Sequence, residues 1–143
     1  MKKNSFDVIL IVLLFSLVLS ACTPTKTKEP ALTVKGLVDR VFSLDDLKAF
    51  PQTSSDYTDK NNETTTYNGV AFGVIFDDLK LAADPVSVKM IAIDDYIGDV
   101  TFEELLACTD CIVAILEDGT LRSVLPGFSG KANVRDLIIL DLQ

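Results

Sequence analysis

The sequence contains no histidine, no tryptophan and only three cysteines among its 143 residues. Histidine is the commonest metal ligand and the commonest general base in proteins, so its absence removes the usual forms of both kinds of site. Serine hydrolysis is disfavoured for the same reason, because Ser123 and Ser129 have no imidazole to activate them. Two thiols at Cys108 and Cys111, without histidine or a second such pair, are too few for a structural zinc site.

Basic residues are also in the minority, with 13 lysines and arginines against 21 aspartates and glutamates, for a net charge of −8. Nucleic acids are therefore disfavoured as partners. Several acidic residues are adjacent pairs at expected helix starts and hairpin tips, where solvated carboxylates are common. Asp94, Asp95 and Asp99 lie close together, but their spacing does not fit a calcium-binding loop.

A long apolar run occurs at residues 8–19, interrupted only by Ser16. It follows Lys2 and Lys3 and precedes Ser20, Ala21 and Cys22, which is the order of a signal peptide. As a helix it would rise about 18 Å, short of the roughly 30 Å hydrocarbon core, so a spanning helix is disfavoured. The alternative without lipid is an ordinary secretory peptide that is cleaved near Ala21.

The end of this run resembles the bacterial lipobox. The resemblance implies cleavage before Cys22, a diacylglyceryl thioether on its sulfur and a membrane-anchored protein on the extracytoplasmic side. We therefore divide the chain into a signal peptide (1–21), a polar tether (22–30) and one domain (31–143), which is long enough to bury its own core.

Apolar periodicity predicts many short strands and about three short helices in this domain, which is a β-rich α+β fold. Strands are expected at 31–36, 86–93, 112–116, 121–125 and 134–142, and the apolar run 137–140 indicates a central strand. Ser43 and Thr101 are expected to cap two helices, and a third is expected over 74–81. Residues 52–66 are either an exposed hairpin or a mobile loop, and 67–70 read as a turn.

Four phrases, at residues 32–38, 42–47, 67–70 and 124–127, resemble in order and spacing the molybdopterin-binding domain of the sulfite oxidase family. The resemblance covers nearly all of residues 31–143. It implies a ligand groove where that family holds its cofactor. The residues expected to line this groove are Asp56, Tyr57, Arg122, Phe128, Lys131 and Arg135.

The chain departs from the family where the metal would be held. The family's enzymes place a molybdenum-ligating cysteine after the first helix, and residues 51–63 contain none. Ala132 stands where the family usually has a cofactor-contacting lysine, and only Arg135 keeps a positive charge at the second such place. We therefore expect the family's scaffold without its metal centre and without a bound cofactor. The alternative is a molybdopterin-dependent oxidoreductase whose thiolate comes from Cys108 or Cys111.

Cys108 and Cys111 form a C-x-x-C pair that follows an expected helix and has Asp110 between the thiols. The helix C-terminus and the carboxylate both disfavour a reactive thiolate, so we expect a structural disulfide and keep a redox carrier as the alternative. The sequence thus favours a lipid-anchored, non-catalytic binding or interaction module, with a small anion or a protein as its partner.

Overall fold

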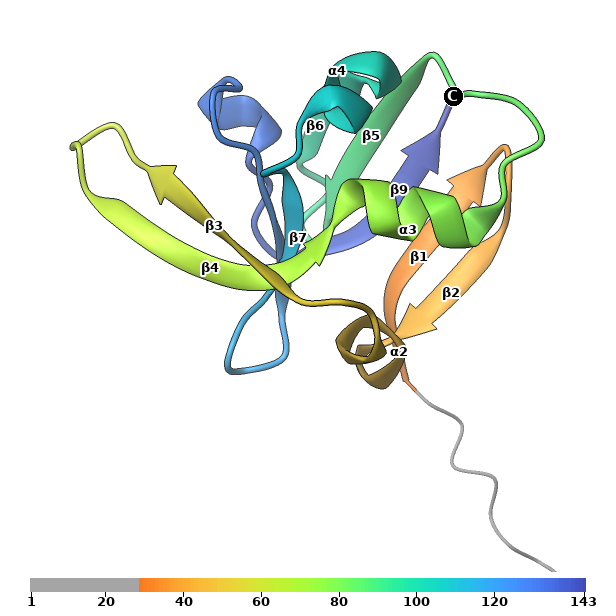
Figure 1. Ribbon diagram of the computed structural model, residues 1–143, viewed down its shortest axis with the longest axis horizontal. Coiled ribbons are helices and arrows are strands. Elements are labelled where there is room, and N and C mark those ends of the chain that lie inside the picture. Colours follow the sequence, from red (N-terminus) through yellow and green to blue (C-terminus); the bar gives the residue numbers. More distant parts are fainter. Residues whose placement is uncertain (1–28) are drawn as a thin grey trace, which may run out of the picture.

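In the computed structural model, which describes residues 29–143, the chain forms two β-sheets joined by three short α-helices (Figure 1). The first sheet has five strands in the order β2 (Arg40–Ser43), β1 (Pro30–Gly36), β9 (Leu137–Leu142), β5 (Ser87–Ala92) and β6 (Ile97–Thr101). The second has four, in the order β3 (Thr53–Thr58), β4 (Thr64–Ala71), β7 (Ile112–Ile115) and β8 (Leu121–Val124). The helices are α2 (Leu44–Ala49), α3 (Phe72–Leu79) and α4 (Phe102–Ala107), with a 3-10 turn, η1, at Gly130–Ala132. The predicted β-rich α+β class with about three short helices is confirmed.

The predicted signal peptide, Cys22 and most of the tether lie outside the described residues. No helix in the described part of the chain is both long enough and apolar enough to cross a bilayer.

Strand β9 lies at the centre of the first sheet, as the apolar run 137–140 predicts. It pairs in parallel with β1 and antiparallel with β5. The strand begins at Leu137, three residues later than expected. Val134 pairs with β8 instead, since its carbonyl accepts from the backbone N–H of Ser123. Asp136, with φ at 50°, then turns the chain from the segment that pairs with β8 into β9.

Two helices begin where capping residues predict. The Ser43 hydroxyl accepts from the backbone N–H of Asp46, whose carboxylate accepts in return from the Ser43 backbone, so α2 starts with a capping box. Thr101 caps α4 in the same manner, through the N–H of Glu104. The third helix starts at Phe72 and ends at Leu79, earlier than the expected 74–81, because Lys80 adopts the left-handed conformation.

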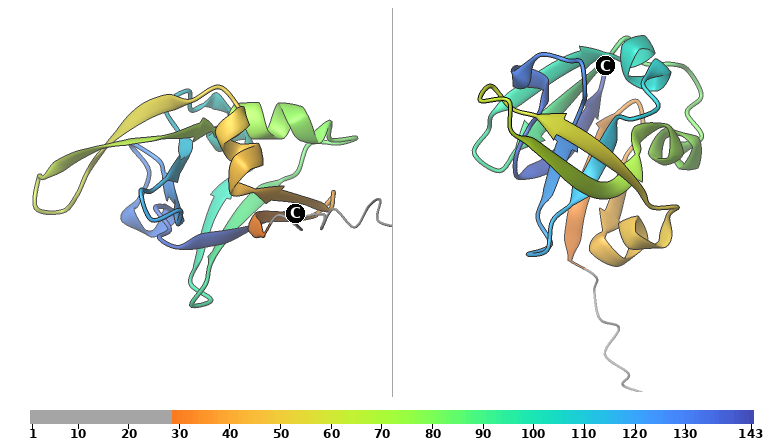
Figure 2. Two further views of the ribbon diagram at one scale, coloured as in Figure 1. Left: turned by 90° about the horizontal axis from the view of Figure 1, so that it is seen from below. Right: turned by 60° about the vertical axis from the view of Figure 1, so that its left-hand side comes forward.

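The polar segment 52–66 contributes to a hairpin rather than a mobile loop. Strands β3 and β4 form a ribbon that extends beyond the rest of their sheet (Figures 1 and 2). At its tip the Asp59 carboxylate accepts from the backbone N–H groups of Asn61 and Glu63, and the Glu63 bond is the main cause that lowers the Asp59 pKa.

The predicted turn at 67–70 is wrong, since these residues form the inner part of β4, where Gly69 pairs with Ala114 of β7. The sequence likewise predicts a hairpin turn over residues 94–98, but Ile97 and Gly98 belong to β6. Gly69 allows close backbone approach to β7 within the sheet, and Gly98 allows close approach to η1; local turn statistics do not distinguish either case from a bend.

The hydrophobic core lies between the two sheets and the helices, and it includes Leu32, Leu105 and Leu140, all fully buried. The second sheet buries its other face as well. There, Ile112, Ala114 and Val124 form a small separate cluster against the rings of Tyr57 and Tyr67. The ribbon therefore folds back over β7 and β8, as Figure 2 shows in its right-hand view.

Candidate functional site

An arginine lies between two tyrosines on the small apolar cluster. Arg122 on β8 pairs with Ala114 of β7, and Ala114 pairs with Gly69 of β4, so the three side-chain positions share one face of the sheet. The arginine reaches across this face to the ribbon. Its guanidinium carbon lies 4.5 Å from the centroid of the Tyr67 ring and 5.3 Å from that of Tyr57. Both distances are within the range of cation–π attraction.

This guanidinium is buried without a counter-charge. Arg122 is only 6% exposed, and its Nη1 donates to the Tyr67 hydroxyl over 2.6 Å. Its Nε is buried and has no hydrogen-bond partner in the part of the chain that the structure describes. Within residues 29–143, Arg122 forms no ion pair with a carboxylate. Because buried donors normally have acceptors, this unpaired Nε is the most unusual polar group on the face.

A second orphaned polar atom lies on the same face. Ser55 on β3 pairs with Tyr67, so its side chain shares the face of the tyrosines and of Arg122. The serine is 5% exposed, and its hydroxyl is buried without a partner. Both unsatisfied side chains therefore lie on one face of the sheet.

The structure divides the six predicted groove residues. Tyr57 and Arg122 are in contact, and Arg135 is joined to Arg122 through a backbone bridge. The side chain of Asp56 lies on the opposite face of β3 and accepts from the Thr66 hydroxyl over 2.6 Å. Phe128 packs against the main core, and exposed Lys131 lies in η1.

Two separate cavities border these residues. One, of about 330 Å³, is lined by Arg135 together with Asp94, Tyr96 and Asp136. The other, of about 290 Å³, is lined by Ser54, Ser55, Asp56, Asp110 and Pro126. Arg135 thus faces two carboxylates in a different cavity from Asp56, so the predicted residues do not line one groove.

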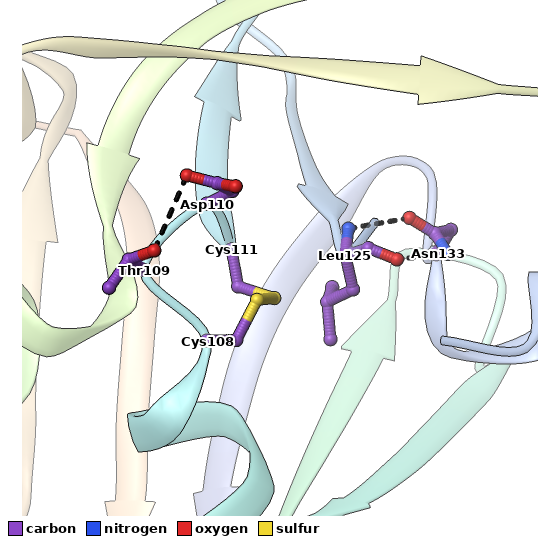
Figure 3. The surroundings of a disulfide bond; sticks show 6 residues. All are labelled: Cys108, Thr109, Asp110, Cys111, Leu125 and Asn133. Atoms are coloured by element: carbon purple, nitrogen blue, oxygen red, sulfur yellow. Dashed lines mark hydrogen bonds between the residues drawn. A yellow bond between two sulfur atoms is a disulfide. The ribbon is translucent and has the colours of Figure 1, made fainter. Parts of the chain in front are cut away.

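Cys108 and Cys111 form a disulfide with an S–S distance of 2.05 Å (Figure 3). It connects the end of α4 to the start of β7, where the carbonyl of Cys111 accepts from the N–H of Phe72. Cys111 is fully buried and Cys108 is half-buried, whereas Asp110 between them is exposed. The disulfide therefore holds an acidic turn at the surface while its own sulfurs belong to the core.

The donor set of the described chain does not resemble a metal centre. Nowhere in residues 29–143 do three or more histidine, cysteine, aspartate or glutamate side chains gather closely enough to hold an ion. Asp94, Asp95 and Asp99 belong to the hairpin turn and to β6, and Asp94 caps the turn by accepting from the N–H of Tyr96.

Sequence reasoning missed Tyr67 and Ser55 as parts of this face. The sequence pattern predicts a turn at Tyr67, and it places Ser55 in a segment that is either a hairpin or a loop. The available signal was alternation, since residues 53, 55 and 57 share one face if the segment is a strand. Which face that is depends on the sheet that the ribbon joins, and local patterns do not contain that information.

The fold is similar to that of a solved enzyme. A chain in the crystal structure of the sulfane dehydrogenase SoxCD from Paracoccus pantotrophus superposes with a TM-score of 0.66 over 80% of this chain, at 17% sequence identity. The superposed part is 38% of that chain, so this protein corresponds to well under half of it. No protein-family model and no curated protein matches the sequence. The chain thus has a fold resembling that of SoxCD. A sequence identity this low supports similarity of fold and nothing beyond it.

Proposed function

We propose that this protein is a lipid-anchored extracytoplasmic binding module, built on a molybdopterin-oxidoreductase-like scaffold that has no metal centre. The observation that carries the proposal is the buried guanidinium of Arg122, whose Nε has no acceptor among the described residues. A ligand with an oxyanion or carboxylate oxygen supplies that acceptor and the missing negative charge. Half-buried Tyr57, on the edge strand β3, is the side chain that moves to admit the ligand.

The thiols of the described chain do not fit a molybdenum centre. A dithiolene-bound metal requires a soft protein ligand, and the hairpin 51–63, where the family has its cysteine, offers hydroxyls and carboxylates instead. Cys108 and Cys111 are joined to each other, and Cys111 is fully buried. The Arg122 face also includes Ile112, Ala114 and Val124, whose aliphatic side chains have no redox chemistry. These features support binding rather than oxidation or reduction.

Anion binding is tested by comparing Arg122→Met with Arg135→Met in the full-length protein. We expect sulfate and acetate, against chloride at equal ionic strength, to raise the melting midpoint of the unchanged protein by several degrees. Arg122→Met should lose this shift, whereas Arg135→Met should keep it, because Arg135 lies in a different cavity beside two carboxylates. Equal shifts in the unchanged protein and in Arg122→Met would contradict the proposal.

The absence of a metal centre is tested by elemental analysis of the protein purified from a cell that makes the molybdenum cofactor. We expect no stoichiometric molybdenum. Near one molybdenum per chain, lost on changing Cys108 or Cys111, would establish the oxidoreductase instead.

The lipid anchor is tested by Cys22→Ser. If Cys22 carries the lipid, the variant should lose lipid labelling and remain uncleaved at that site. Metabolic labelling with a fatty acid, followed by fractionation of membranes, measures both effects. Recovery of normally processed, membrane-resident Cys22→Ser protein would refute the lipoprotein assignment.

A further inference from the structure

Strand β3 exposes a free edge whose backbone groups can be assigned from the hairpin. The N–H of Asp59 donates to the carbonyl of Glu63 over 2.9 Å, so this pair is a hydrogen-bonded one. Hydrogen-bonded and non-bonded pairs alternate along an antiparallel ladder. Counting back from Asp59, residues 53, 55 and 57 direct their backbone groups toward β4. Ser54, Asp56 and Thr58 therefore direct their N–H and carbonyl groups outward, away from the sheet.

The other sheet edges are covered or short. The segment after β8 pairs with it, through the Ser123 N–H and the carbonyl of Val134. The turn η1 packs against β6, where the Cβ position of Gly98 would lie 2.8 Å from the carbonyl oxygen of Lys131. Strand β2 has four residues, and its Arg40 pairs with Asp78 over 3.6 Å. Among the described strands, β3 is thus the six-residue edge whose outward N–H and carbonyl groups form no backbone hydrogen bond.

A cavity runs along this edge. Its lining includes Ser54, Ser55 and Asp56, which are consecutive on β3. Consecutive side chains of a strand point to opposite faces, so a cavity that contacts all three must follow the strand's edge rather than one face. On its other side are Asp110 and Pro126, and its volume is about 290 Å³. An extended backbone laid in this cavity would meet the outward groups of Ser54 and Asp56.

The chemistry of the cavity selects a basic segment. Asp56 and Asp110 are both exposed and both line it, and within residues 29–143 neither forms an ion pair. Ser55 lines it too; this serine is 95% buried, and its hydroxyl has no partner among residues 29–143. The Cys108–Cys111 disulfide fixes the turn that carries Asp110, as Figure 3 shows. The turn that carries the Asp110 carboxylate is therefore fixed before a partner binds.

We propose that the free edge of β3 docks an extended segment of a partner protein, which adds a fifth strand to this sheet and places a lysine or arginine between Asp56 and Asp110. Backbone hydrogen bonds to Ser54 and Asp56 provide affinity, and the two carboxylates provide specificity. The site differs from the Arg122 face in the charge that it binds, since it takes a cation where Arg122 takes an anion, although Ser55 borders both. Failure of either proposal would leave the other standing.

The test uses full-length protein and pools of short, end-capped peptides with a fixed central residue and randomised flanks. Pools centred on lysine or arginine should bind, and pools centred on glutamate should not. Asp56→Asn and Asp110→Asn should each weaken binding of the lysine pool about threefold, and added salt should weaken it further. Asp99→Asn, on the covered edge at β6, should have no effect.

Backbone pairing is tested at Ser54. Ser54→Pro removes an outward N–H and should abolish binding, while Ser54→Ala keeps that N–H and should bind normally. Amide hydrogen exchange of the unchanged protein provides a readout without any variant: peptide should slow exchange at Ser54 and Asp56 but not at Ser55, which already pairs with β4. The absence of binding by every pool, equal binding of the glutamate pool, or unchanged exchange at Ser54 and Asp56 would overturn the proposal.

Discussion

Removal of residues 136–143 should abolish cooperative folding. Strand β9 is the only connection between the β1–β2 pair and the β5–β6 pair in the described sheet, so its loss divides the sheet into two hairpins. Isolated two-stranded hairpins are marginally stable at best. The deletion also removes Leu137, Leu140 and Leu142 from the core, each at most 1% exposed.

The expected loss exceeds what a domain of this size can tolerate. Truncation of one buried leucine to alanine typically costs about 2–5 kcal/mol, and whole domains are stable by only about 5–15 kcal/mol. Two point variants on the strand provide a graded comparison. Leu140→Ala should fold with a markedly lower midpoint, and Ile139→Ala, on the half-buried opposite face, should lose much less. Circular dichroism during heating measures all three, and an unchanged cooperative transition in the truncated protein would show that β9 is peripheral.

The central position of β9 could be predicted because it depends on a local property. Residues 137–140 are all apolar, and a continuous apolar run is typical of a strand in the middle of a sheet. The helix starts at Ser43 and Thr101 were predictable for the same reason, since a cap and its partner are three residues apart. Interactions over such short distances leave their pattern in the sequence.

The candidate site was less predictable because its residues come together only through the tertiary fold. Tyr67 and Arg122 are 55 positions apart, and their contact requires the β3–β4 ribbon to cross the face of β7 and β8. The resemblance to the sulfite oxidase family selected Tyr57 and Arg122, which are in contact, together with Phe128, which is in the main core. The resemblance predicts a set of residues, but it does not specify which of them face each other. The hairpin that carries some of these residues differs in its side chains from that of the family.

Gly69 explains why the sequence predicts a turn at 67–70 where the structure has a strand. The same residue leads us to expect a large effect from a small substitution. Tyrosine, asparagine and glycine in succession are typical of a turn. Here the glycine is needed because the backbones of β4 and β7 approach each other closely. A Cβ at Gly69 would lie 2.1 Å from the carbonyl oxygen of Val113 and 2.6 Å from the Cα of Ala114. Both atoms are backbone, so no change of rotamer relieves the contact, and β4 and β7 must separate.

We therefore expect Gly69→Ala to destabilise the protein by about 3 kcal/mol, at the upper end of what added methyl groups cost in packed interiors. Gly73→Ala is the matched control, since Gly73 lies in α3 and, apart from its chain neighbours and the backbone of its own helix, no described atom lies within 4 Å of its Cβ position. That substitution should stabilise the protein by about 0.5–1 kcal/mol, because alanine favours the helix over glycine. Urea unfolding of the two variants should move the midpoint in opposite directions. Equal behaviour of the two variants would show that β4 does not approach β7 this closely. The ribbon that carries Tyr57, Tyr67 and the free edge of β3 would then be placed differently, and both proposed binding sites would lose their structural basis.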